Sequence, residues 1–403
     1  MVSAIEYVIR IYNLLKGVNN VKEKLKQKDP DAIKLGVIAA AAINFPALFD
    51  PVQTHPGVVV VAIAARSRVK AEAQVARYKL EAAKVYDSYE EVLQDPDVDA
   101  VYIPLPNGLH HKWALKAMRA GKHILIEKPI ASNAAEAQEI QNCAKETGKI
   151  ALEAFHWLFH PAAHRVKEIV ESGKYGHLTA TFSKMVIPPG GIFADDIRFK
   201  YELGGGASMD LCYVLSSSLY YASSPDNVKG VSFEVLSTKP QLSNRDKRVD
   251  ENMDTTIVIR NADSSRPPVM CTTVCKMVLP WYLGFIPQLW SLTPMVVLEL
   301  EEAKIEFSAF CAPFMGHKII VTDKSGKKTT ESCYTNGPIW GRRGEAWWTT
   351  YRYQLEAFVD RVRAAKKQEE YHGPWVELDE SVKLMEIMDA VYEKSGMPKR
   401  GTE

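Results

Sequence analysis

Residues suited to binding a dinucleotide follow the apolar run VVVVAIAA at 58–65, which is succeeded by Arg66, Ser67 and Arg68. A guanidinium can stack on an adenine ring and pair with a 2′-phosphate, whereas a fold that selects NAD would carry Asp or Glu here for the ribose hydroxyls. Arg66 and Ser67 therefore favour NADP, and NAD is the less favoured cofactor. The alternative is that both arginines are ordinary solvated charges.

The turn that would hold the pyrophosphate, AAAAIN at 39–44, contains no glycine. Glycines normally let backbone amides and a helix N-terminus come close to a phosphate at this place. We expect cofactor contacts from Ala39, Ala41, Ile43 and Asn44. A plain buried strand followed by a helix would have the same sequence pattern, so the turn alone does not decide between the two.

The elements that would position these residues form an alternating series. Apolar runs lie at 34–39, 58–65, 99–103, 123–127 and 150–154, and segments with helical spacing lie at 69–80, 110–120 and 133–147. This alternation predicts a doubly wound parallel sheet, here a dinucleotide-binding Rossmann domain at 31–155. The fold class is therefore α/β.

After a helix at 160–172, the hydrophobic period changes to two, which is typical of antiparallel strands. Such segments lie at 178–187, 229–238, 254–260, 269–278, 296–310 and 317–323. They predict a C-terminal α+β domain with a large, mostly antiparallel open sheet at 156–376, to which the family resemblance given below assigns substrate binding and dimerisation. Helices are expected at 350–366 and 379–395, the second in a C-terminal segment at 377–403 that packs back near the Rossmann domain.

Composition excludes several classes of protein. The 403 residues exceed the roughly 250–300 at which a single core stops growing, so two domains are expected. Lys and Arg number 50 and Asp and Glu 49, which gives no field that would attract nucleic acid. The six cysteines are scattered without metal-ligand spacing, so we expect no metal site, no secretion and a cytoplasmic location. The longest uncharged run, 277–298, holds three prolines and predicts no membrane span.

An N-terminal helical extension is expected at 1–30, because Ile5, Val8, Ile9, Tyr12 and Leu15 recur at helical spacing. We favour packing of this helix against the body of the protein or a second subunit. The alternative is that it lies on a membrane surface.

Residues 101–129, VYIPLPNGLHHKWALKAMRAGKHILIEKP, closely resemble the Gfo/Idh/MocA oxidoreductase family. Further similar segments follow in order: EAFHWLFHP (153–161), DDIRFKYELGGGASMDLCY (195–213), TYRYQLEAFVDRV (350–362) and DAVYEKSGMP (389–398). Within the family, the chain is most similar to the dimeric dihydrodiol dehydrogenases and NADP-dependent D-xylose 1-dehydrogenases, in a fungal-like form. The resemblance covers nearly everything after residue 33.

The resemblance implies a set of cofactor contacts beyond those above: Pro104, Leu105, Asn107, His110, Glu127, Lys128, Trp157 and Arg198. It implies that Lys128 stands beside the nicotinamide ribose, where its ammonium would stabilise alkoxide charge. A lysine between Glu and Pro after a strand is otherwise usually a solvated charge.

The resemblance also implies an acid/base group after the glycines at 204–206. Tyr213 is the candidate proton carrier and Asp210 the candidate that opens the helix behind it, with a simple N-cap and a buried aromatic as the alternatives. The residues expected at the substrate are His156, Asp196, Phe199, Asp210 and Tyr213. His156 is expected as a wall residue without a catalytic role.

Three residues depart from the family pattern. Ala39 stands where the first glycine is usual, which adds a methyl group where the pyrophosphate should approach. Tyr213 follows Asp210 by three residues where four are common, so that Val214 takes the usual place. Leu158 stands where related sequences often carry Arg, which removes a polar contact to substrate.

We therefore expect an NADP-dependent oxidoreductase that moves hydride between nicotinamide and a CH–OH or C=O carbon of a sugar-like or cyclic small molecule. The alternative is a member that has lost redox turnover and binds a ligand, or catalyses a non-redox step, in the inherited site. The resemblance implies a homodimer through the C-terminal sheet. The aromatic segment 276–292, with Phe285 and Trp290, is expected either to cover the substrate or to form an interface.

Overall fold

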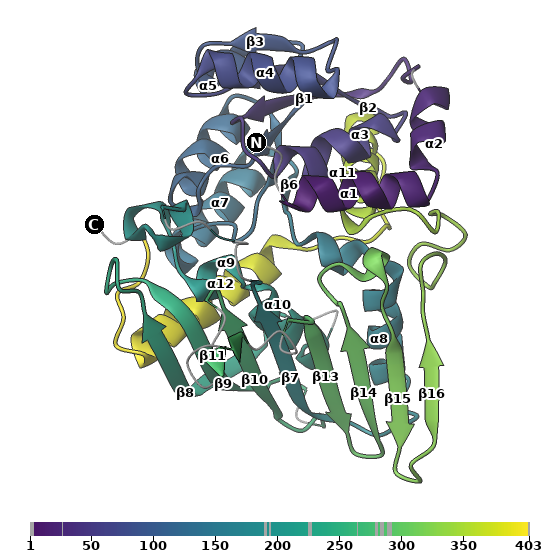
Figure 1. Ribbon diagram of the computed structural model, residues 1–403, viewed down its shortest axis with the longest axis vertical. Helices are drawn as coiled ribbons and strands as arrows, with labels where there is room; N and C mark the ends of the chain where they lie inside the picture. The colour runs from purple at the N-terminus through teal and green to yellow at the C-terminus, as the bar shows by residue number, and fades with distance from the viewer. Residues whose placement is uncertain are drawn as a thin grey trace. The chain divides into compact units, whose positions relative to one another are not determined.

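The computed structural model describes residues 4–25, 27–188, 192, 195–224, 228–263, 265–278, 281–282, 286–287 and 292–401. The chain forms two compact units (Figure 1). The first comprises Met1–Ile130, Gln138–His160 and Tyr334–Leu378, and the second Ala131–Ala137, Pro161–Cys333 and Asp379–Glu403. Residues 334–378 thus belong to the compact unit of the Rossmann strands, although the sequence grouped most of them with the later domain. The expected domain boundaries stay a prediction about independently folding parts.

The first unit is built on a six-stranded sheet in the order β3-β2-β1-β4-β5-β6, and every neighbouring pair is parallel. Its strands are β1 (Ile33–Ile38), β2 (Val58–Ala64), β3 (Lys84–Tyr86), β4 (Ala100–Ile103), β5 (His123–Ile126) and β6 (Ala151–Glu153). All residues of the inner strands β4 and β5 are buried, as expected for strands covered on both faces, and those of the edge strand β6 are buried as well. The doubly wound sheet predicted from the apolar runs is confirmed. The short β3 was not predicted.

The helices of the first unit are α1 (Ala4–Leu15), α2 (Val18–Lys24), α3 (Asp50–Gln53), α4 (Arg68–Tyr78), α5 (Tyr89–Gln94), α6 (His110–Arg119), α7 (Ala134–Thr147, whose first turn lies in the second unit) and α11 (Thr350–Lys367). Single-turn helices lie at Phe45–Phe49, Asn107–Leu109 and His156–Phe159. Local signals set several helix starts. Ser88 accepts a hydrogen bond from the Glu91 amide at α5, and Thr349 accepts one from the Arg352 amide at α11.

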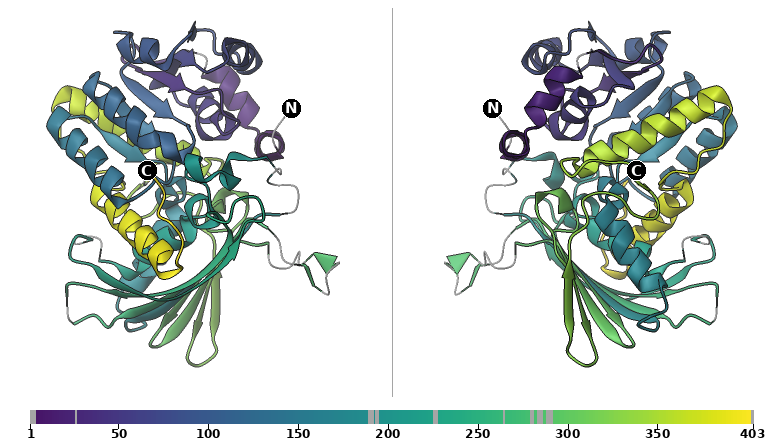
Figure 2. Two further views of the ribbon diagram at one scale, coloured as in Figure 1. Left: turned by 90° about the vertical axis from the view of Figure 1, so that its left-hand side faces the viewer. Right: turned by 90° about the vertical axis from the view of Figure 1, so that its right-hand side faces the viewer.

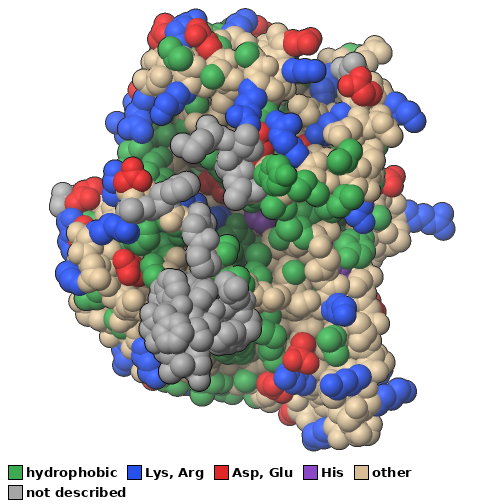
Figure 3. Space-filling model, in the orientation of Figure 1, with side chains coloured by type: hydrophobic (Ala, Val, Ile, Leu, Met, Phe, Trp, Pro, Cys, Tyr) green, Lys and Arg blue, Asp and Glu red, His purple; other side chains and the backbone are tan. Residues whose placement is uncertain are grey.

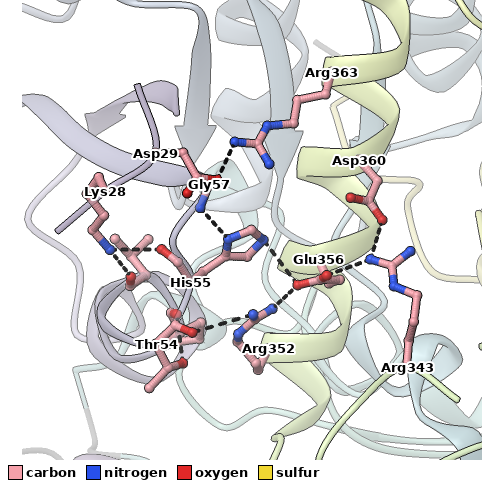
Figure 4. A network of polar contacts seen from close by, with 12 residues as sticks. Lys28, Asp29, Thr54, His55, Gly57, Arg343, Arg352, Glu356, Asp360 and Arg363 are labelled. Carbon is pink, nitrogen blue, oxygen red and sulfur yellow. Dashed lines mark hydrogen bonds and ion pairs between the residues drawn. The ribbon is translucent and has the colours of Figure 1, made fainter. Parts of the chain in front are cut away.

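Helix α11 is fixed within the first unit by a buried polar network (Figure 4). Arg352 donates to Glu356, which also lies 3.2 Å from His55 Nε2. Burial raises the pKa of this carboxyl, but the neighbouring cations, Arg352 first among them, outweigh burial and lower the pKa to about 2. The Gly57 amide donates to His55 Nδ1 at 2.9 Å, so Nε2 carries the proton that faces Glu356. Arg363 pairs with Asp29 at 2.8 Å, which ties the segment before β1 to the same helix.

The second unit contains an eight-stranded sheet in the order β16-β15-β14-β13-β7-β10-β9-β8. Its strands are β7 (Leu178–Val186), β8 (Ser232–Leu242), β9 (Asp250–Arg260), β10 (Val269–Lys276), β13 (Met295–Leu300), β14 (Ala303–Ser308), β15 (Ile319–Asp323) and β16 (Lys328–Glu331), and a separate pair is formed by β11 (Trp281–Tyr282) and β12 (Ile286–Pro287). All pairs are antiparallel except β7 with β10. The mostly antiparallel sheet expected from the period-two segments is confirmed.

One face of this sheet is covered by helices, as Figure 2 shows. They are α8 (Pro161–Glu171), α9 (Ala207–Asp210), α10 (Tyr213–Ala222) and α12 (Leu378–Lys394), and single turns lie at Ile197–Phe199, Tyr201–Leu203 and Pro313–Met315. Helix α10 meets β7 through Ser217 and Ser183, whose hydroxyls lie 2.8 Å apart in the buried layer. Most of the aromatic segment at 276–292, including Phe285 and Trp290, lies outside the described residues.

Cys271 and Cys275 are buried on the same side of β10, as packing residues. Among the described residues there is no group of three or more His, Cys, Asp or Glu arranged to hold a metal ion. In the same part of the chain, no helix has the length and apolar character needed to cross a bilayer.

Candidate active site

The candidate cofactor residues of the first unit lie at one edge of its sheet. Because the six strands are parallel, the segments that follow β1, β2, β4, β5 and β6 all emerge at their carboxyl ends. The strand order reverses between β1 and β4, and open α/β sheets bind ligands at such a switch point. The tertiary structure thus gathers segments that are separated by more than a hundred residues in sequence.

The turn after β1 is closed by side chains instead of by glycine. Asn44 donates from Nδ2 to the Ala39 carbonyl at 2.7 Å and to Gln74 at 3.0 Å, and Gln74 in turn donates to the Ala41 carbonyl at 2.9 Å. None of residues 39–44 has a positive φ, so alanine fits the backbone conformation. Asn44 is buried and holds the turn, while Ala39, Ala41 and Ile43 keep part of their surface exposed. Gln74 was missed because a glutamine on an amphipathic helix carries no distinguishing signal.

The pair after β2 is arranged as a phosphate-binding group requires. Arg66 is exposed, and Ser67 occupies the N-cap of α4. The neighbouring Arg68 is engaged by Glu72 at 2.8 Å and Asp87 at 2.9 Å. In the part of the chain that the structure describes, no carboxylate pairs with the Arg66 guanidinium, which leaves it available to an anion. The residues present therefore fit a 2′-phosphate.

His110 joins two of the loops at this edge. Its Nδ1 lies 2.8 Å from the Pro129 carbonyl and its Nε2 lies 2.8 Å from the Leu105 carbonyl. Burial lowers the pKa of His110 to about 4, so the imidazole is neutral and donates to one carbonyl at a time. The residue is completely buried, which does not fit the direct cofactor contact expected from the sequence. It positions Leu105 and the segment around Lys128 instead.

Lys128 follows β5 and is partly exposed at the sheet edge. Burial lowers the pKa of both His110 and His156, and the positive charge of Lys128 lowers both further. Its neighbour Glu127 accepts a hydrogen bond from Tyr102 at 2.6 Å, and the Lys128–Pro129 peptide is cis. Pro104 is buried and Asn107 half-buried in the adjacent loop.

The wall after β6 is formed by His156 and Trp157, both buried. His156 Nδ1 lies 2.8 Å from the Thr350 hydroxyl, and its ring packs on Tyr351 with centroids 3.9 Å apart. Burial and the charge of Lys128 lower the pKa of His156 to about 3. A neutral, packed imidazole fits the wall role predicted for it and is not suited to act as a base near neutral pH.

In the second unit, Arg198 links the two candidate carboxylates. It donates to Asp210 at 2.7 Å and to Asp196 at 3.0 Å, and the charge of Asp210 raises the pKa of the guanidinium. Asp196 also caps the short turn at Ile197–Phe199, and the Phe199 ring is buried under the Arg245 guanidinium. The carboxylate of Asp210 is therefore held in one orientation by a charge-assisted bond.

Asp210 and Tyr213 lie on different helices. Asp210 is the last residue of α9 and Tyr213 the first of α10, with Leu211 and Cys212 between them. The expectation that Asp210 opens a helix is therefore wrong, because helix α9 ends at Asp210 after one turn. Tyr213 is buried, and so is Val214, the residue at the family's usual position.

The glycine segment before α9 depends on residues that sequence reasoning missed. Gly206 has φ 143°, and a Cβ at Gly205 would lie 2.5 Å from the Arg198 carbonyl, so both positions require glycine. Arg400 donates to the Gly205 carbonyl at 2.7 Å and to Asp250 at 3.0 Å, and Asp250 accepts the Ser208 amide at 2.8 Å. Arg400 lies in a polar segment after α12, and the sequence of that segment does not distinguish a buried arginine from a solvated one.

Lys128 belongs to the first unit and Asp210 and Tyr213 to the second. Within each unit the predicted residues are brought together: the five loops in one, and Asp196, Arg198 and Asp210 in the other. The pairing of Tyr213 with Lys128 stays a prediction.

Comparisons with known proteins agree with this architecture. The D-xylose 1-dehydrogenase (NADP(+)) 2 of Haloferax volcanii is 29% identical over 364 residues, which cover 89% of this chain and 96% of that protein. An uncharacterised oxidoreductase, ORF334, of Rhizobium meliloti is 36% identical over 207 residues, which are 50% of this chain and only 60% of that protein. The 3-ketoreductase KijD10 of Actinomadura kijaniata, solved with NADP and TDP-benzene, has the same fold, with a TM-score of 0.71 and 22% identity over 90% of this chain and 98% of that one.

Residues 19–155 match the profile described as oxidoreductase family, NAD-binding Rossmann fold. The match covers the strands and loops that carry the candidate cofactor residues from Ala39 to Lys128. Residues 19–155 thus match the Gfo/Idh/MocA oxidoreductase family, in agreement with the resemblance seen in the sequence.

Proposed function

We propose that this protein is an NADP-dependent oxidoreductase that transfers hydride between the nicotinamide and a CH–OH or C=O carbon of a sugar-like or cyclic small molecule. The observation that carries the proposal is the position of Lys128, whose charge reaches two buried neutral histidines at the carboxyl edge of the Rossmann sheet. A cation at this edge is suited to stabilise an oxyanion that develops on a reacting carbon.

The preference for NADP is supported by Arg66 and Ser67 at the end of β2. The guanidinium is exposed beside a helix N-cap, and a 2′-phosphate would meet a cation and backbone amides there. The names of the Haloferax dehydrogenase and the KijD10 complex, which both include NADP, point the same way.

The acid and base roles rest on residues of both units. A bound nicotinamide would supply or accept the hydride, and Lys128 would hold the substrate oxygen. We assign the proton transfer to Tyr213, with Asp210 as the polar group held beside it by Arg198. His156 and Phe199 would form walls, and Asp196 would orient Arg198.

Two further features belong to the proposal. Six cysteines without a disulfide support a reducing, cytoplasmic location. The face of the eight-stranded sheet opposite its helices carries Phe182, Val258, Val274 and Val297 among polar residues, and we assign it to a homodimer interface.

Calorimetric titration with NADPH and NADH tests the cofactor assignment. We expect NADPH to bind at least tenfold more tightly, and Arg66→Asp to remove that preference by replacing a cation with an anion. Arg68→Gln is the matched control, because the guanidinium of Arg68 is already engaged by Glu72 and Asp87. If neither dinucleotide binds, the protein is the ligand-binding or non-redox member of the family instead.

A screen of aldoses, inositols and dihydrodiols with NADP⁺, followed at 340 nm, then tests the substrate class. Reduction of NADP⁺ by at least one of these compounds, and its loss in Lys128→Met, is the expected result. Turnover of a substrate in Lys128→Met at the wild-type rate would contradict the role given to this lysine.

A further inference from the structure

Helix α1 is fixed on the first unit by its polar side. Glu6 is buried and pairs with Arg77 at 2.8 Å and with the Tyr78 hydroxyl at 2.9 Å, and Asn13 donates to Asp50 at 2.7 Å. Ile9 is the apolar residue that is fully buried with them. These contacts set the rotation of α1 about its own axis, so the side that faces solvent is determined by the fold.

The solvent-facing side of α1 is almost entirely apolar. Tyr7 is 64% exposed, Leu14 70% and Leu15 78%. The other exposed apolar side chains of the helix are Ile5, Val8 and Ile11. In Figure 3 they correspond to the group of hydrophobic side chains at the place where Figure 1 draws α1. A patch of this kind marks an interaction surface, because single exposed apolar residues are normal but six on one short helix are not.

Cations border this apolar face on both sides. At about 100° per residue, the exposed apolar residues cover roughly half of the helix circumference. Arg10 lies at one edge, where its guanidinium also pairs with Glu6 at 2.9 Å, and Lys16, the residue that follows α1, lies at the other edge. Both are exposed. The one acidic residue of α1, Glu6, is buried on the opposite side. Because Arg10 and Arg77 share the single carboxylate of Glu6, this group keeps a net positive charge. The exposed surface of α1 thus combines large apolar side chains with positive charge.

We propose that the apolar face of α1 docks on the surface of a membrane that contains anionic lipid. An amphipathic helix binds such a surface when its apolar residues enter the interface and flanking cations meet the headgroups. The cytoplasmic leaflet carries negative lipid, which suits the reducing compartment given above. Docking differs from spanning, since among the described residues no helix is able to cross a bilayer.

Charge argues against a second copy of this chain as the occupant. A twofold contact between two α1 helices would bring Lys16 and the net positive group of Arg10, Arg77 and Glu6 near the same charges of the other copy. A helix of 12 residues also covers far less than the roughly 800 Å² per partner of a standard interface.

Co-sedimentation of the full chain with vesicles tests this proposal without depending on enzyme activity. We expect binding to vesicles of phosphatidylcholine with 30% phosphatidylserine, at least tenfold weaker binding to pure phosphatidylcholine, and weakening of the former by salt. Leu14→Gln with Leu15→Gln should lower the partition coefficient at least tenfold, because both side chains enter the interface. Lys16→Gln should lower only the dependence on phosphatidylserine.

The matched control is Met315→Gln with Ile339→Gln, which replaces apolar residues that are 55% and 43% exposed elsewhere on the chain. This variant should bind as the wild type does. Circular dichroism should report the wild-type fold for all variants, since the replaced side chains are exposed. Three results would overturn the proposal: no vesicle binding by the wild type, equal loss in the control, or a Leu14/Leu15 variant that changes the oligomeric mass but not vesicle binding.

Discussion

Replacement of Arg400 by Met should destabilise the second unit by about 3–5 kcal/mol, the cost of removing one partner from a buried ion pair. The guanidinium and the Asp250 carboxylate are both completely buried and lie 3.0 Å apart. Arg400 also donates to the Gly205 and Pro398 carbonyls and lies over the Tyr392 ring at 4.0 Å. Methionine fills much of the same volume, so the loss comes chiefly from the charge and the hydrogen bonds.

Asp250 would keep two donors in this variant, the Tyr392 hydroxyl at 3.0 Å and the Ser208 amide at 2.8 Å. Burial already raises the pKa of Asp250, and without the arginine this carboxyl should take up a proton more readily. The free energy of unfolding should therefore fall less at pH 5 than at pH 8. Urea unfolding followed by far-ultraviolet circular dichroism at the two pH values measures this difference.

A double-mutant cycle separates the ion pair from general damage to the core. Asp250→Asn removes the charge that Arg400 leaves behind, so the double variant should be less destabilised than the sum of the two single variants. Enzyme turnover gives a second readout. Arg400 binds the Gly205 carbonyl and Asp250 binds the Ser208 amide, and these contacts fix the segment that precedes Asp210. In Arg400→Met, kcat should therefore fall while KM for NADPH is unchanged. A loss below about 1 kcal/mol in Arg400→Met, or strict additivity in the cycle, would refute the reasoning.

Three further outcomes are expected. Lys128→Met should lower kcat by about 10²–10³-fold with little change in cofactor affinity, because the charge of this lysine acts on the developing oxyanion. Lys128→Arg should restore part of the rate. Equal losses of kcat in both variants would argue for a structural role. Ala39→Gly should tighten NADPH binding several-fold, since it removes a methyl group near the pyrophosphate. The fold should stay unchanged, because residue 39 does not have a positive φ. Titration calorimetry measures the affinity, and an unaltered affinity would show that the methyl group is no obstacle. The first unit should lose stability as the pH falls from 6.5 towards 4. His55 and His156 have pKa values of about 3 in the folded protein against an ordinary 6.5, so the unfolded chain takes up these two protons at a higher pH than the folded chain does. Urea unfolding midpoints that do not change over this range would contradict the prediction.

Much of the first unit could be predicted because its signals are local. Central strands of a parallel sheet are buried on both faces and read as continuous Val and Ile runs, as β2 and β4 do. Once the strands are known to be parallel, Arg66 and Lys128 must emerge at one edge. The loops after the strands were therefore found correctly, and their relation to one another followed from topology.

Contacts between distant side chains could not be predicted in this way. His110 was expected at the cofactor, but its two carbonyl contacts depend on the loops after β4 and β5 meeting behind the edge. Helix α11 was grouped with the later domain, and its place in the first unit depends on pairs such as Arg363 with Asp29, 334 residues apart. The hydrophobic periodicity of each segment predicts its secondary structure but does not show which distant residues it contacts.

The sequence by itself determined the order and type of the elements, the carboxyl-edge loops and the preference for a cofactor with a 2′-phosphate, since these follow from burial periodicity and residue chemistry within a few residues. Only the tertiary structure decided that Arg400 braces the glycines before Asp210, and that α1 buries Glu6 and Asn13 while it exposes leucines. Helical spacing shows that a helix has an apolar side, but which side is buried depends on the hydrogen-bond partners that the rest of the chain brings to it.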